Sequence, residues 1–182
     1  EYTVEAGRPD TFAVDKLSVI KEFGATRISI NPQTMNDSVL ELIGRKHTAA
    51  DTVAAFKMAR EIGFNNVNMD LIAGLPGDTF ESFKNTLNEI LSLAPESVTV
   101  HSLSLKRSSF LNIKGDLPEA EIGATASLMV DTAHDMLSQN GIVPYYMYRQ
   151  SKTVGNLENV GYSKVGCECL YNVYIMDETH SI

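Results

Sequence analysis

The fold is decided by the stretch Asn66-Val67-Asn68-Met69-Asp70-Leu71-Ile72-Ala73-Gly74-Leu75-Pro76-Gly77-Asp78. Apolar residues alternate with polar ones from Asn66 to Leu71, which predicts a β-strand with one apolar and one polar face. The Gly-Leu-Pro-Gly sequence ends this strand, and apolar residues at helical spacing follow it. In an α/β barrel the apolar face turns toward the helices. We therefore expect Asp70 to point inward near the carboxyl end of the strand, where ligands bind.

The 182-residue chain is acidic, with a formal net charge of -8 and a pI near 4.9, and 43% of its residues are hydrophobic. This length and composition predict one core, in one domain or in one domain with an appendage. The acidic balance argues against nucleic-acid binding, which depends on clustered Lys and Arg. No apolar run approaches the roughly 20 residues of a membrane span, and no signal-peptide pattern opens the chain. We therefore expect a cytoplasmic protein.

The strand-then-helix pattern repeats along the first 100 residues. The other predicted strands are 2–6, 27–31 and 98–101. Helices are predicted from Val14 to Gly24, from about Asn36 to Ile43, from Thr48 to Gly63 and from Asp78 or Thr79 to Pro95. Alternating strands and helices of this length predict parallel βα units, arranged in an open sheet or a barrel.

Polar residues form one whole face of these strands. That face carries Thr3 and Glu5, then Ser29, Asn31 and Gln33, then Asn68 and Asp70, and finally Thr99 and His101. A closed barrel usually fills its interior with Val, Ile and Leu, and each unpartnered buried polar group costs about 1–3 kcal/mol. The pattern favours a wide interior that holds a ligand. The alternative is that these side chains hydrogen-bond one another across the strands.

The βα pattern stops after Leu105. The segment from Lys106 to Leu117 is irregular, and a long helix follows it and ends before Gly141. The stretch 144–150 predicts a strand whose three tyrosines and Arg149 form either a wall for a flat anionic ligand or ordinary cross-strand packing. Residues 155–162 are rich in turn formers, and 171–176 predict another short strand.

The only cysteines, Cys167 and Cys169, form a Cys-x-Cys pair. Two thiolates do not complete a tetrahedral metal site, and no neighbouring Cys or His supplies the missing ligands. A redox or metal role stays open, but ordinary small residues in a reducing cytosol are the favoured interpretation. The sequence therefore predicts no metal site in this chain.

Several stretches together resemble the oxygen-independent coproporphyrinogen III oxidase (dehydrogenase) family of radical S-adenosyl-L-methionine (SAM) enzymes. The resemblance is carried by Glu5, Arg27–Gln33, Arg45, Asn68–Pro76 and Tyr145–Gln150. It implies an α/β fold, a partial (β/α) barrel of the radical SAM type from its third strand onward, with a C-terminal α+β appendage. The implied domains are a partial barrel at 1–115 and the start of a truncated substrate or accessory region at 116–182.

The resemblance also implies a chemistry. A [4Fe-4S] cluster reduces SAM, and the resulting radical converts propionate side chains of coproporphyrinogen III to vinyl groups in haem biosynthesis. By position, the implied SAM contacts are Glu5, Gln33, Arg45, Asp70, Ile72 and Ser104. Of these, Glu5, Gln33 and Asp70 also follow from the polar-face pattern, whereas Arg45, placed on the helix after the second strand, rests on the resemblance alone. Tyr146, Tyr148 and Arg149 are candidate substrate contacts, and no catalytic residue is assigned.

The chain departs from this family in one respect. The family's cluster-binding Cys-x-x-x-Cys-x-x-Cys loop and its Gly-rich SAM motif are absent, and Cys167 and Cys169 have the wrong number and spacing to replace them. We therefore expect a piece of a larger enzyme, cut on both sides, that neither binds the cluster nor catalyses the reaction alone. The partners of the whole enzyme would be a tetrapyrrole substrate and an electron donor. An unpaired edge on the first strand predicts self-association of the piece as a dimer or swapped assembly.

Two other functions stay open. The parent protein could be a haem-binding chaperone of the same superfamily, because both kinds of protein would bind tetrapyrroles. It could also be a TIM-barrel lyase of different chemistry that uses Glu5, Asp70 and His101 as acid and base groups.

Overall fold

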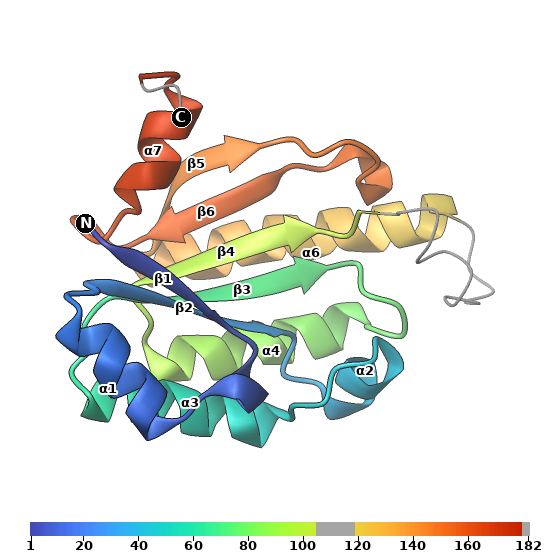
Figure 1. Cartoon of the computed structure of the whole chain (residues 1–182). Coiled ribbons are helices and arrows are strands. Elements are labelled where there is room, and N and C mark those ends of the chain that lie inside the picture. The colour runs from blue at the N-terminus through green and yellow to red at the C-terminus, as the bar shows by residue number, and fades with distance from the viewer. Residues whose placement is uncertain (105–118, 180–182) are drawn as a thin grey trace.

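The computed structural model describes residues 1–104 and 119–179. A six-stranded sheet in the order β1-β2-β3-β4-β6-β5 runs through the molecule (Figure 1). The irregular segment predicted from Lys106 to Leu117 and the predicted domain boundary at 115/116 lie outside the described residues, so the division into two domains stays a prediction.

The first four strands confirm the predicted βα repeat. They are β1 (Thr3–Gly7), β2 (Arg27–Gln33), β3 (Val67–Ala73) and β4 (Ser97–Ser102), and each pairs with the next in parallel. The helical segments between them are η1 (Pro9–Thr11), α1 (Val14–Glu22), α2 (Asp37–Leu42), α3 (Ala49–Glu61) and α4 (Phe80–Leu93). A capping box forms at the start of α3, where Thr48 and Asp51 each accept a hydrogen bond from the other's backbone N–H.

The C-terminal half adds an antiparallel hairpin to the same sheet. After the long helix α6 (Glu119–Gln139), strand β5 (Val143–Tyr148) leads through η2 (Val154–Asn156) to β6 (Asn159–Ser163). Strand β6 pairs antiparallel with both β4 and β5. The sheet is therefore mixed, and the barrel it begins to form stays partial.

One prediction in this half is wrong, and a second stretch contains more than its turn-rich composition indicates. Residues 155–162 are more than a turn, because they contain most of β6. Gly161 suggested a turn, but it makes room for the Tyr146 ring, which occupies the place where a Cβ atom would lie. Residues 171–176 belong to a helix, α7 (Leu170–Met176). Their aromatic and β-branched composition favours a strand, but in the part of the chain that is described no neighbouring strand pairs with them.

The hydrophobic core lies between the sheet and the helices on one of its faces. In Figure 1, α1, α3 and α4 lie together below the sheet and α6 runs behind it. Fully buried strand residues face them: Ile28, Ile30, Met69, Leu71 and Val98. The helices contribute Leu17, Phe56, Ala59, Phe83, Leu87, Ile90, Met129, Ala133 and Leu137. The strand residues between the apolar ones therefore face away from the helices. In the described ranges, no helix is long and apolar enough to cross a bilayer.

The Glu96 carboxylate joins four segments at the amino ends of the strands. Its Oε1 accepts a hydrogen bond from Arg60 Nη2 at 2.9 Å and lies 3.5 Å from Lys164 Nζ. Its Oε2 lies 2.8 Å from the same Arg60 nitrogen and accepts a hydrogen bond from the Val67 backbone N–H at 3.0 Å. The Glu96 side chain is only 14% exposed, so its removal would leave partly desolvated donors without an acceptor.

We therefore expect Glu96→Ala to lower the free energy of unfolding by about 1–3 kcal/mol, as measured by urea denaturation. Glu158→Ala is the matched control, because Glu158 pairs with an Arg149 side chain that is 63% exposed. Such a surface pair contributes about 0–1 kcal/mol. If both variants lose the same free energy of unfolding, the contacts of Glu96 contribute no more to stability than an exposed ion pair does.

Candidate functional site

A hydrogen-bonded network of polar side chains covers the face of the sheet opposite the helices. Asn68 is its centre: its amide nitrogen donates to Ser29 Oγ at 3.0 Å and to Asp70 Oδ1 at 2.7 Å. Its oxygen accepts from Thr99 Oγ1 at 3.2 Å, and Ser29 Oγ donates to Asn31 Oδ1 at 2.9 Å. The alternative of mutual satisfaction across the strands is therefore confirmed for these residues.

Asp70 points inward, as predicted. Its neighbours Met69 and Leu71 are fully buried against the helices, whereas the Asp70 side chain lies on the polar face and is 15% exposed. Its second oxygen, Oδ2, lies 3.9 Å from His101 Nε2, and the His101 side chain is 29% exposed. The carboxylate thus keeps one oxygen that the network does not use and that a ligand can approach.

Glu5 lies on β1 beside this network. Its side chain is partly open to solvent, yet burial against the sheet and then the nearby Asp70 carboxylate raise its pKa. Hydrogen bonding from Asn31 and Ser29 and the charge of Arg27 oppose that shift. The structure therefore brings two acids, Glu5 and Asp70, from strands far apart in the sequence to one polar surface.

Gln33 ends β2 in an unusual backbone conformation. Its φ of 72° is in the left-handed region, which a residue other than Gly adopts at a cost of about 1 kcal/mol or more. Its side chain donates to the Asn31 carbonyl at 3.4 Å. The preceding Pro32 carbonyl accepts from Nε2 of His47, a residue that is 2% exposed. His47 therefore supports the Gln33 backbone, and sequence reasoning missed it because an isolated histidine carries no spacing signal.

The predicted position of Arg45 is wrong in detail. Arg45 lies in the loop between α2 and α3, not on a helix, because α2 ends at Leu42. Its side chain is half-buried, and its pKa is lowered by burial and by the charge of Arg8, while Asp10 opposes the shift. The loops that follow β1 and β2 thus bring Arg8 and Arg45 together. In the described ranges, no hydrogen bond or ion pair joins Arg45 to Glu5 or Asp70.

The last two predicted SAM contacts lie toward the carboxyl ends of β3 and β4. Ile72 shares the face of Asp70, is partly exposed, and is the register partner of His101. Ser104 follows β4, forms a β-bridge with Thr153 and donates through Oγ to the Ser151 carbonyl at 3.2 Å. All six predicted contacts therefore have described positions, but only Glu5 and Asp70 are shown to interact with each other.

The tyrosines of β5 cover part of the polar face. Tyr146 and Tyr148 stack with ring centroids 6.2 Å apart and planes 3° from parallel, and Tyr145 meets Tyr146 edge-on at 4.8 Å. Burial and then Tyr145 raise the pKa of Tyr146, while a hydrogen bond with Thr99 opposes this. The tyrosines thus pack on one another along β5, and Tyr146 also packs across the strands on Gly161 of β6, while a contact with a ligand stays a prediction. Arg149 is exposed and pairs with Glu158 at 3.0 Å.

The two cysteines do not form a metal site in the described residues. Cys169 is buried at the start of α7 with its Sγ 3.9 Å from Thr3 Oγ1, and Cys167 is half-buried in the preceding loop. Burial raises the pKa of the Cys167 thiol. Residues 1–104 and 119–179 contain no group of three or more His, Cys, Asp or Glu side chains that could hold a metal ion.

The raised pKa of Glu5 predicts a pH dependence of stability. The folded state binds the Glu5 proton more tightly than the unfolded state does. The contribution of Glu5 to folding stability is therefore greatest below its ordinary pKa of 4.5 and is lost as the pH rises through the raised pKa. We expect the Glu5→Gln variant to have a higher Tm than the unmodified chain at neutral pH and the same Tm at acid pH. Thermal unfolding from about pH 4 to about pH 8 tests this. Glu89→Gln, an exposed change on α4, is the control, and the same shift in it would contradict the prediction.

Comparison with known proteins gives the family. A model of the radical SAM superfamily matches residues 2–90. The chain is 46% identical over all 182 residues to the oxygen-independent coproporphyrinogen-III oxidase-like protein HemZ of Bacillus subtilis, of which it covers 36%. It is 42% identical over 114 residues to the heme chaperone HemW of Bacillus subtilis, a match that includes 62% of this chain and 30% of HemW. The chain thus spans about a third of the length of these relatives.

The fold has a solved counterpart. The structure of coproporphyrinogen III oxidase (HemN) from Escherichia coli, described as a radical SAM enzyme, matches with a TM-score of 0.73 and 26% identity. The match covers 91% of this chain and 36% of HemN. The chain therefore belongs to the radical SAM superfamily, and its predicted resemblance to the oxygen-independent coproporphyrinogen III oxidases is confirmed.

Proposed function

We propose that these 182 residues are the SAM-binding side of an oxidoreductase that oxidatively decarboxylates the propionates of coproporphyrinogen III to vinyl groups. The observation that carries the proposal is the match to HemZ, which extends over 100% of this chain at 46% identity. The polar sheet face with Glu5 and Asp70 supports it, because a closed aliphatic interior would leave no room for a cofactor.

The side chains on this face fit SAM. Carboxylates suit ribose hydroxyls and cationic groups, so Asp70 and Glu5 would hold these parts of the molecule. A half-buried guanidinium suits a carboxylate, so Arg45 would bind the carboxylate group of SAM. Gln33 and Ser104 would add hydrogen bonds, and Ile72 an apolar contact. When bound, SAM together with an iron–sulfur cluster supplies one-electron chemistry.

The iron–sulfur cluster does not fit the residues of this chain. A [4Fe-4S] cluster is held by Cys thiolates, and the sequence contains only two cysteines, in a Cys-x-Cys pair. We propose that the ligands belong to another part of a longer protein. The partners of that protein would be a tetrapyrrole, contacted by Tyr146, Tyr148 and Arg149, and an electron donor. We propose a cytoplasmic location for it.

A haem chaperone is the second candidate, and the 42% identity to HemW over 114 residues favours it. The two functions differ in what happens to the tetrapyrrole. The test uses the complete protein that carries this chain, with its cluster reconstituted anaerobically. Conversion of coproporphyrinogen III to vinyl products, followed by mass spectrometry, supports the oxidase, whereas transfer of intact haem to an acceptor without such conversion supports the chaperone. The superfamily match speaks against the TIM-barrel lyase.

Asp70→Asn tests the cofactor site. The variant keeps an oxygen that accepts from Asn68 but loses the charge, so the sheet should stay intact while SAM binding weakens about tenfold or more. The measurement is isothermal titration of SAM into the cluster-loaded complete protein. Asp131→Asn, an exposed change on α6, should bind SAM normally. If both variants bind like the parent, Asp70 does not contact SAM.

The free edge of β1 predicts self-association of the 182-residue chain. Among the residues that the structure describes, β1 pairs with β2 alone and lies at one end of the sheet order, so its other edge presents unpaired backbone groups. We expect light scattering to give a mass of a dimer or larger that falls on dilution. A monodisperse monomer at all concentrations would refute this.

A further inference from the structure

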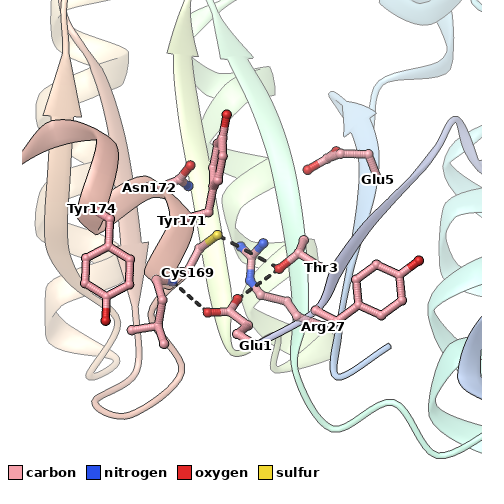
Figure 2. Close-up of a pocket in the computed structure, with 10 residues that line it drawn as sticks. Glu1, Thr3, Glu5, Arg27, Cys169, Tyr171, Asn172 and Tyr174 are labelled. Carbon is pink, nitrogen blue, oxygen red and sulfur yellow. Dashed lines mark hydrogen bonds between the residues drawn. The ribbon is translucent and has the colours of Figure 1, made fainter. Parts of the chain in front are cut away.

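A cavity of about 540 Å³ lies at the amino ends of β1 and β2, apart from the predicted SAM contacts except Glu5. Residues of β1, β2 and α7 line it, and Figure 2 shows Arg27 in its middle, between Thr3 and Cys169. Its size is in the range of small-molecule sites, which is about 300–1,000 Å³.

Arg27 is a buried cation whose hydrogen bonding is incomplete. The residue is 2% exposed, and its Nη2 donates to the hydroxyl of Ser97 at 3.1 Å. Its Nε has no hydrogen-bond partner in the part of the chain that the structure describes. Within the same residues Arg27 forms no ion pair with a carboxylate. Buried charges are normally paired, whereas the Arg27 Nε is a donor without a partner and the guanidinium has no carboxylate within ion-pair distance in the described residues, although Glu5 is near enough for the charge of Arg27 to lower its pKa.

A second observation at the cavity also points to a ligand. Three side chains of α7 that line it are large and exposed: Leu170 at 44%, Tyr171 at 58% and Tyr174 at 43%. Figure 2 shows Tyr171 and Tyr174 on the α7 side of the cavity, across from β1. Contiguous exposed apolar surface beside a concave site is typical of binding grooves. The cavity thus combines an apolar, aromatic wall with one buried cation.

The charges around the cavity restrict the ligand. Glu1 and Glu5 also line it, but the Glu1 carboxylate already accepts from Thr3 Oγ1 at 2.9 Å and from the Leu170 N–H at 2.6 Å. Two acids near one guanidinium disfavour a dianion such as phosphate. A single carboxylate, by contrast, has the two oxygens that an arginine's Nε and Nη groups pair with.

We propose that this cavity binds a carboxylate group carried on a flat apolar body, with Arg27 as its counter-ion and the α7 side chains as its wall. The site is separate from Gln33, Arg45 and Asp70, and it does not require SAM or a cluster. It can therefore be tested on the 182-residue chain whether or not the proposed function holds.

The probe is 3-phenylpropionate, titrated into the chain labelled with ¹⁵N at the arginine Nε. We expect a saturable shift of the Arg27 Nε–H signal with 3-phenylpropionate, no shift with the neutral 3-phenylpropanamide, and little with inorganic phosphate. Arg27→Lys keeps the positive charge but loses the planar guanidinium, whose N–H groups can pair with both oxygens of a carboxylate. Calorimetry should therefore show that 3-phenylpropionate binds about tenfold or more weakly.

Tyr171→Ala is a second variant, because Tyr171 is exposed and its loss leaves the core intact even if the Arg27 variant does not fold. It should weaken binding several-fold, whereas Phe23→Ala, an aromatic change on an exposed residue after α1, should not. The proposal is overturned if the Arg27 signal does not respond, if the amide shifts it as strongly as the acid, or if Tyr171→Ala binds like the parent.

Discussion

The side-chain amide of Asn68 holds the polar face of the sheet together. It donates to Ser29 on β2 and to Asp70 on its own strand, and it accepts from Thr99 on β4. An amide is the one neutral side chain that both donates twice and accepts, so Asn68 can satisfy three neighbours at once. This arrangement lets three adjacent parallel strands carry polar residues where such sheets usually carry aliphatic ones, and it fixes the direction of Asp70.

The polar face of the sheet also contains features that lower the stability of the fold. Burial and then the nearby Asp70 carboxylate raise the pKa of Glu5, and Gln33 adopts a left-handed conformation. Features of this kind persist where the surrounding structure enforces them, as the buried His47 does through the Pro32 carbonyl. Arg27, whose buried Nε has no hydrogen-bond partner within residues 1–104 and 119–179, is a comparable feature at the opposite end of the strands.

Much of the parallel half could be predicted, because each of its strands alternates apolar and polar residues and because α2, α3 and α4 begin at Asn or Thr residues that are typical of helix starts. The start of α3 near Thr48, the start of α4 at Asp78 or Thr79 and the inward direction of Asp70 follow from such local signals. The C-terminal half was harder to predict from the sequence. Gly161 suggested a turn, but β6 forms because β4 and β5 pair with it on both sides. Residues 170–176 looked like a strand and form a helix. His47 and Arg27 have no sequence pattern, because their roles depend on contacts with residues 15 and 70 positions away.

The sequence by itself determined the order of the βα units, the polar face that they share and the family resemblance, because alternation and motif spacing are local properties. Only the tertiary structure decided which polar groups meet. In the structure Glu5 lies beside Asp70, Arg45 lies in a loop near Arg8, and β6 pairs with β4. The tertiary structure also encloses Arg27 between β1 and α7. These contacts join segments far apart in the chain, and their geometry depends on strand register and helix packing, which no single stretch of sequence encodes.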